Sequence, residues 1–285
     1  MAEHSKGSRP PGAVQSPESI SPRDALSRVL VAILVPAALA LLVGVITGAL
    51  FRREGGAIPS AAPLFAALGI ASWFIGLRFY GLRGLGLRIK RPLWAGIGFA
   101  VLAWVIVLIG RFLPGRPDIS YAEDGQAIVR VAFLIETLAI RSEGSGRAFF
   151  FLLLFEAFAT QLWTFGLVFR ALADWRGALA AAVGSGILYG MTGFLLFQES
   201  FVPELSGLLY FLTWGVLYGM IRLRTGSLLG PVLIQALQTF TVWFVFQPPD
   251  DMPATGIRVV YLFIAALFAI VIWRLWPRRE SDYRI

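Results

Sequence analysis

Residues Val29–Phe51 read VLVAILVPAALALLVGVITGALF, a run of 23 residues without a charged side chain. About 20 apolar residues in a helix are enough to cross the ~30 Å hydrocarbon core of a bilayer. The apolar centre of a secretory signal is shorter, roughly 7–15 residues. The run therefore predicts a membrane-spanning helix and indicates a membrane protein.

The residues before this run have a different composition. Residues 1–22 are rich in Pro, Ser and Gly and contain no apolar run. Such a segment cannot bury enough apolar surface to fold, so we expect a disordered cytoplasmic tail. Residues 23–285 show no internal repeat, and we predict that they form a single transmembrane domain.

Seven more stretches carry no charged residue or a single one. A series of such stretches predicts an all-α polytopic membrane protein, with about eight transmembrane helices in total. The shortest stretch is flanked by Arg258 and Arg274, whose long side chains can reach the two membrane surfaces. The stretches are 55–77, 92–110, 148–169, 177–198, 205–221, 225–249 and 259–273.

The charged residues between the stretches set the expected orientation. Arg130 and Glu136 interrupt residues 126–140, and we interpret this segment as an amphipathic helix on the outer surface. This choice places the basic residues of 78–91 and of the C-terminal end inside, as the positive-inside rule requires. We therefore expect a multi-pass protein of the inner, cytoplasmic membrane with both termini in the cytoplasm.

The composition excludes several classes of protein. Only 15 % of the residues are charged, against about 25 % in soluble domains. The chain has no cysteine, and its one histidine, His4, lies in the tail, which excludes thiolate chemistry and a histidine metal site within the membrane. The net charge of +8 follows from the orientation and does not indicate a nucleic-acid partner. We expect membrane lipids as partners and no cofactor, with a bound lipid or pigment left open.

Three windows in the second half carry a recognisable pattern. They are TQLWTFGLVFRAL at 160–172, SGILYGMTG at 185–193 and LYGMIRLRTGSLLGPVLIQALQT at 217–239. Their order and spacing resemble the CPBP (CAAX protease and bacteriocin-processing) family of intramembrane metalloproteases, which includes the type II CAAX prenyl endopeptidases. The resemblance implies a CAAX-protease-like core at about 148–246, whose motif helices lie at roughly 148–172, 177–198 and 225–246.

The same resemblance implies where the family's catalytic residues would lie. The two family glutamates fall on Thr160 and Gln161, and the family arginine falls on Phe165. The aromatic residue and histidine of the second motif fall on Tyr189 and Gly193. The histidine and asparagine of the third motif fall on Gln235 and Thr239. Every ionisable residue of the motif set is therefore replaced.

These replacements point away from the family's chemistry. Zinc is held by imidazole, thiolate or carboxylate groups, and a hydrolytic water needs a general base. Thr160, Gln161 and Gln235 provide neither, but they can hydrogen-bond across helices. We therefore expect no zinc site and a pseudoprotease that works as a subunit, scaffold or assembly factor for another membrane protein. A small transporter or lipid-binding protein is a further alternative.

Glu156 supports a different alternative, an active intramembrane endopeptidase with a non-standard site. It interrupts an otherwise apolar span, and a carboxylate inside a membrane is a functional candidate by default. It lies four residues before Thr160, on the same face of a helix. The competing interpretation is a structural glutamate paired with Arg130 or Arg147.

Overall fold

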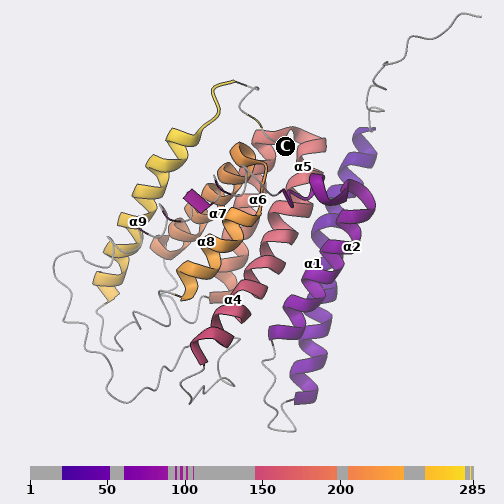
Figure 1. Cartoon of the computed structure of the whole chain (residues 1–285), viewed down its shortest axis with the longest axis horizontal. Coiled ribbons are helices and arrows are strands. Elements are labelled where there is room, and N and C mark those ends of the chain that lie inside the picture. The colour runs from indigo at the N-terminus through magenta and orange to yellow at the C-terminus, as the bar shows by residue number, and fades with distance from the viewer. Residues whose placement is uncertain are drawn as a thin grey trace, which may run out of the picture.

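The computed structural model describes residues 21–51, 61–88, 145–197, 205–240 and 254–279, together with positions 94, 97, 98, 101, 105 and 283. All regular elements among these residues are helices (Figure 1). The expected outer-surface helix at 126–140 and nearly all of the expected span at 92–110 lie outside the described residues. Residues 1–20 of the expected tail also lie outside them.

Two long helices form one edge of the molecule. α1 (Pro22–Phe51) and α2 (Ala61–Gly84) lie side by side, at the right of Figure 1. Pro36 lies inside α1 and cannot donate a hydrogen bond to the carbonyl of Ala32, four residues earlier. The indole nitrogen of Trp163 donates to that carbonyl at 3.1 Å. Pro36 therefore leaves the carbonyl of Ala32 available to Trp163, and this hydrogen bond links α1 to the π-helical turn.

A continuous helical segment, Ser145–Arg176, includes the first motif window at 160–172. α4 (Ser145–Gln161) passes into a π-helical turn (Leu162–Val168) and then into α5 (Phe169–Arg176). All seven residues of the π-helical turn are buried. Turns of this kind occur mostly as single insertions within α-helices, frequently at functional sites. The π-helical turn follows directly after Thr160 and Gln161.

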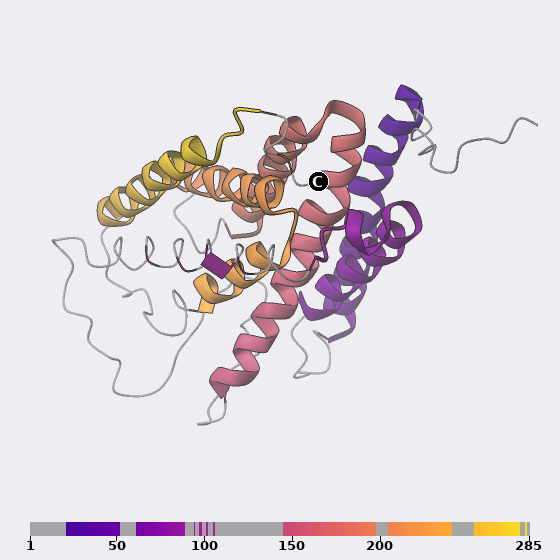
Figure 2. The same cartoon turned by 45° about the horizontal axis from the view of Figure 1, so that its top comes forward.

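α6 (Ala178–Phe197) and α7 (Leu205–Thr225) pack with their backbones in contact. A Cβ on Gly186 would lie 2.7 Å from the carbonyl oxygen of Gly215, and a Cβ on Gly190 would lie 2.6 Å from that of Phe211. Small residues permit this approach in membrane proteins. α9 (Ala254–Leu275) packs on α7 at the edge opposite α1, as both views show (Figures 1 and 2).

The third motif helix begins later than the sequence suggested. We predicted a helix from residue 225, but α8 spans Leu229–Phe240. Gly226 has a φ of +72°, which ends α7, and the hydroxyl of Ser227 accepts a hydrogen bond from the backbone N–H of Leu229 at 3.2 Å. A glycine at positive φ is a helix C-cap and a serine is a favoured N-cap, so the turn separates two helices. α8 then packs against α4.

The described residues confirm an all-α polytopic membrane protein. Five of the described helices are long and apolar enough to cross a membrane, and a shorter apolar helix covers Tyr261–Leu275. The outward faces of α1 and α9 expose large apolar side chains, as surfaces in contact with lipid do. They include Leu34, Leu41, Val45, Val259, Ile270 and Trp273.

Candidate functional site

Three of the motif positions meet between α4 and α8. The side-chain oxygen of Gln235 accepts a hydrogen bond from Gln161 Nε2 at 2.9 Å. The amide nitrogen of Gln235 donates to the hydroxyl of Thr160 at 3.1 Å. That hydroxyl donates in turn to the backbone carbonyl of Glu156 at 2.9 Å. We call Thr160, Gln161 and Gln235 the amide cluster.

The amide cluster is neutral and largely satisfied internally. Both ends of the Gln235 amide are engaged, and Gln161 is completely buried. One acceptor, Gln161 Oε1, has no hydrogen-bond partner among the described residues. The arrangement agrees with the expectation that these side chains hydrogen-bond across helices. It links α4 to α8 at the positions where the family resemblance implies catalytic residues.

The next two motif positions form an aromatic cluster beside it. The rings of Phe165 and Tyr189 have their centroids 5.6 Å apart, and Tyr218 contacts both at 6.0 Å and 5.3 Å. These spacings are typical of favourable tilted and edge-to-face pairs. The position of the family arginine is thus part of a buried ring contact.

The last two motif positions do not join these clusters. A Cβ on Gly193 would lie 3.0 Å from the ring of Phe211, so this position packs α6 against α7. Thr239 is half-buried, one turn beyond Gln235, and within the described residues its side chain makes no hydrogen bond to the amide cluster. Its neighbour Gln238 donates to the hydroxyl of Tyr210 at 2.6 Å.

Glu156 is buried one turn before Thr160. Its Oε2 atom has no hydrogen-bond partner in the part of the chain that the structure describes. Arg130 and the side chain of Arg147, the partners that we considered, lie outside the described residues, so the pairing stays a prediction. Glu156 is the one carboxylate near the amide cluster among the residues described.

The residue types present do not fit a zinc ion. No group of three His, Cys, Asp or Glu side chains that could hold a metal occurs within the described residues. Amide and hydroxyl groups around one carboxylate are not the donor set that zinc requires. Within the described residues, the arrangement can therefore form hydrogen bonds between helices, and its side chains are not a donor set for zinc.

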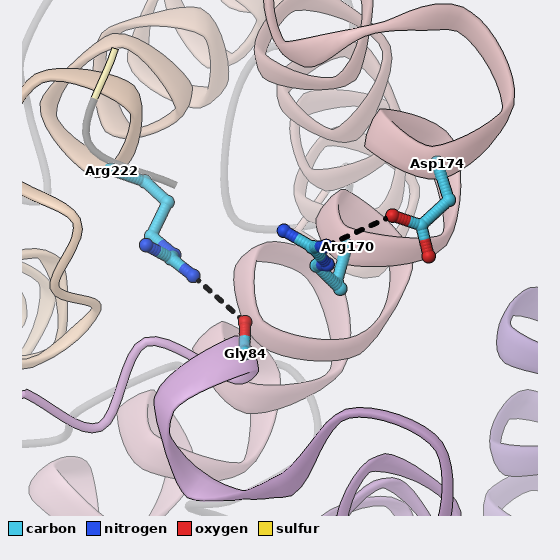
Figure 3. Close-up of polar contacts among 4 residues, drawn as sticks. All are labelled: Gly84, Arg170, Asp174 and Arg222. Carbon is cyan, nitrogen blue, oxygen red and sulfur yellow. Dashed lines mark hydrogen bonds and ion pairs between the residues drawn. The ribbon is translucent and has the colours of Figure 1, made fainter. Parts of the chain in front are cut away.

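Arg222 is a buried residue whose importance the sequence did not reveal. Only 1 % of its surface is exposed. Its Nε donates to the carbonyl of Phe165 at 3.1 Å, and its Nη2 donates to the carbonyl of Gly84 at 3.0 Å (Figure 3). It thereby joins α7 to the π-helical turn and to the end of α2. A single sequence gives no signal that separates it from the exposed arginines around it.

The turn after Arg222 is docked on the end of α2. The backbone N–H of Leu228 donates to the carbonyl of Gly86 at 3.0 Å, and the Ser227 hydroxyl donates to the carbonyl of Arg88 at 3.1 Å. The Thr225 hydroxyl donates to the carbonyl of Ile221 at 2.7 Å. The Arg-Thr-Gly-Ser-Leu phrase at 224–228 therefore works as a structural connector.

These elements define a class of protein: a polytopic helical membrane protein with a neutral polar cluster enclosed between two of its helices. Residues 145–241 match the family model described as Type II CAAX prenyl endopeptidase Rce1-like. The match confirms the predicted family resemblance: over this region the chain is similar to the Rce1-like type II CAAX prenyl endopeptidases. No curated protein and no solved structure matches the chain.

The matched region corresponds to a set of whole helices, from α4 to α8. It begins with α4, includes the π-helical turn, α5, α6 and α7, and ends one residue after α8. It coincides closely with the core of 148–246 that we predicted. α1, α2 and α9 lie outside it and flank the matched helices (Figure 1).

Proposed function

We propose that this protein is a non-catalytic relative of the CAAX proteases that binds another integral membrane protein, as a subunit, scaffold or assembly factor. The observation that carries the proposal is the amide cluster. At positions where the family resemblance implies carboxylates and a histidine, Thr160, Gln161 and Gln235 hydrogen-bond to one another. A network of amide and hydroxyl hydrogen bonds stabilises helix packing but supplies no base.

The energetics favour retention of the fold without the reaction. A charged side chain at the centre of a membrane costs about 2.5–3.5 kcal/mol on insertion scales. Replacing it with an amide or hydroxyl removes that cost, and interhelical hydrogen bonds contribute about 0.6–2 kcal/mol each. A core of this kind is suited to presenting surfaces to a partner and does not need water at its centre.

The proposal includes a location in the inner membrane with both termini in the cytoplasm. Arg83, Arg176, Arg224 and Arg274 lie at the ends of α2, α5, α7 and α9, and basic residues gather on the cytoplasmic side of membrane proteins. Labelling a cysteine introduced in the tail, in sealed vesicles of known orientation, tests this location.

The first test is purification from native membranes in a mild detergent, followed by size analysis and mass spectrometry. We expect the chain to elute in a complex with a second integral membrane protein at a fixed ratio. Elution as a monomer or homodimer, with no other protein at a fixed ratio, contradicts the proposal.

One observation favours a second candidate, an intramembrane endopeptidase that uses Glu156. This carboxylate is buried beside the amide cluster with one oxygen atom unpartnered among the described residues. Cleavage of a prenylated peptide by the purified protein, abolished in Glu156→Gln at unchanged expression, would establish it. The matched control is Asp174→Asn. This variant removes a carboxylate that pairs with Arg170 and lies on the same continuous helical segment, Ser145–Arg176. Loss of folded protein in Glu156→Gln favours a structural role.

A further inference from the structure

The outward face of α1 ends in an arginine. Leu34, Leu30 and Leu26 are 59 %, 49 % and 40 % exposed and lie four residues apart toward the start of the helix. Arg23 is exposed three residues before Leu26. Residues three or four apart share a face of a helix, so Arg23 continues the face whose leucines are suited to contact lipid.

α2 shows the same change on the neighbouring helix. Ile70 and Phe74 are 58 % and 68 % exposed, and Arg78 is exposed four residues after Phe74 on the same face. One helical turn advances about 5.4 Å along the axis, so this face changes from apolar to charged over that distance. A long basic side chain at such a boundary keeps its stem in the hydrocarbon and extends its charge to the headgroups. Arg23 and Arg78 therefore mark the headgroup level.

A contact between the two helices shows that these ends are adjacent. The guanidinium carbon of Arg28, on α1, lies 5.4 Å from the centre of the Phe79 ring, on α2. The two helices pack side by side along one edge of the molecule (Figure 1). The Phe79 ring is itself 42 % exposed. Aromatic and basic side chains that meet at the ends of spans are typical of the boundary between membrane and water.

α2 is interrupted just beyond this contact. Gly81 has a φ of +64°, and a Cβ on it would meet nothing within 4 Å, so the break lies on open surface. Leu82 is 49 % exposed, and Arg83, directly after it, is exposed as well. A leucine that can enter the acyl chains beside an arginine that stays among the headgroups is the composition of a segment lying at the membrane surface.

Four arginines therefore lie at this end of the α1–α2 pair. We call them the arginine rim: Arg23, Arg28, Arg78 and Arg83. Within the part of the chain that the structure describes, no ion pair neutralises them. The nearby carboxylates have other contacts, since Asp24 accepts a hydrogen bond from the Ser21 hydroxyl at 2.7 Å and Asp174 pairs with Arg170 at 3.1 Å. The arginine rim thus presents a net positive charge.

We propose that the arginine rim binds the headgroups of anionic phospholipids in the leaflet around this end of α1 and α2. Guanidinium groups bind phosphate oxygens through paired hydrogen bonds, and several together attract negatively charged lipid. The occupant is a lipid because Arg23 and Arg78 continue faces of exposed apolar side chains, and a partner in water would not meet those faces. One arginine near a membrane surface accounts for about a fivefold preference, so the rim should give at least that.

The experiment uses a single introduced cysteine, because the chain has none. Leu82→Cys is labelled with bimane, and the full chain is reconstituted in phosphatidylcholine vesicles. A small fraction of the lipid carries a nitroxide near its headgroup, on either phosphatidylglycerol or phosphatidylcholine, and quenching of the bimane is measured as this fraction rises. We expect phosphatidylglycerol to be preferred at least about fivefold, and the preference to fall in high salt, which screens exposed charges.

Variants test whether the arginine rim causes the preference. Arg78→Gln combined with Arg83→Gln changes two exposed positions of α2 and should remove most of the preference. Arg23→Gln, on α1, should remove part of it. The control is Arg274→Gln, which removes an exposed charge from the end of α9, at the opposite edge of the molecule, and should leave the preference unchanged.

Three results overturn the proposal. The first is equal quenching by the two labelled lipids. The second is a preference that survives the combined change of Arg78 and Arg83. The third is an equal loss in Arg274→Gln, which would mean only a general effect of net charge. If the combined variant does not fold, an unchanged preference in Arg23→Gln contradicts the proposal instead. None of these results depends on whether the chain also binds another membrane protein.

Discussion

The α6–α7 interface and the α4–α8 interface are held together in opposite ways. Between α6 and α7 the backbones touch, and glycines at 186, 190, 215 and 219 make room for that contact. Between α4 and α8 the side chains of Thr160, Gln161 and Gln235 connect the helices by hydrogen bonds.

The two kinds of contact are those expected of helices that are surrounded by lipid instead of water. Apolar side chains gain little by leaving lipid for one another, so helices associate through close packing and through hydrogen bonds between side chains. The α6–α7 interface shows the first kind of contact, and the α4–α8 interface shows the second. Close backbone packing leaves no room for substitution, whereas a hydrogen-bond network tolerates exchange of residues that keep its donors and acceptors.

The largest effect is expected from Gly215→Ala. The new Cβ would collide with the carbonyl oxygen of Gly186, and backbone atoms cannot move aside without separating the helices. We expect a loss of about 3 kcal/mol of stability or more, measured as the yield of monodisperse protein and its unfolding midpoint.

Gly48→Ala is the matched control for this substitution. Gly48 also lies within a helix, but a Cβ there meets nothing within 4 Å. Alanine is the better helix former by about 1 kcal/mol, so this variant should be equal to or more stable than the wild type. Equal destabilisation by the two variants would show that the α6–α7 contact is looser than the structure indicates.

The next largest effect concerns the beginning of α8. Ser227→Ala removes the N-cap of α8 and the hydrogen bond to the carbonyl of Arg88. We expect a loss of about 1–2 kcal/mol in unfolding free energy. Ser21→Ala removes the same kind of contact at the exposed start of α1, where the Ser21 hydroxyl accepts from the backbone N–H of Asp24 at 3.2 Å.

The exposed cap competes with water, so Ser21→Ala should cost less, about 0.5 kcal/mol. Denaturant titration of both variants in mixed micelles provides the comparison. A larger loss for Ser21→Ala than for Ser227→Ala would contradict the interpretation that the turn at 224–228 anchors α8.

The sequence predicted what depends on composition and local pattern. Long uncharged runs are sufficient for an all-α membrane fold, which the described helices show. The family resemblance also assigned Thr160, Gln161 and Gln235 to motif positions, and the structure brings these three side chains together between α4 and α8.

The sequence did not predict contacts between distant segments. The bond from Trp163 to the carbonyl that Pro36 leaves open joins positions 131 residues apart, and Arg222 contacts Gly84 across 138 residues. The π-helical turn adds one residue to a helix without a change in composition. The burial of Arg222 could not be predicted, because the positive-inside rule counts charges near helix ends and does not distinguish a buried arginine from an exposed one.

The sharpest test of the comparison is a double-mutant cycle on Gln161→Leu and Gln235→Leu. Each single variant removes the hydrogen bond between the two amides and leaves one of them in place, whereas the double variant removes both groups. We expect the double variant to be more stable than the sum of the single losses implies, with a coupling energy of about 0.6–1.7 kcal/mol.

A second cycle provides the control. Thr213 lies on α7 and its hydroxyl donates to its own helix, at 2.8 Å from the carbonyl of Leu209. Gln161→Leu and Thr213→Val should therefore be additive within about 0.5 kcal/mol. Additivity in both cycles would mean that the α4–α8 interface depends on packing, as α6–α7 does, and that the amide cluster does not hold the two helices together. Coupling in the first cycle alone would establish that hydrogen bonds hold the interface at the positions where the family resemblance implies catalytic groups.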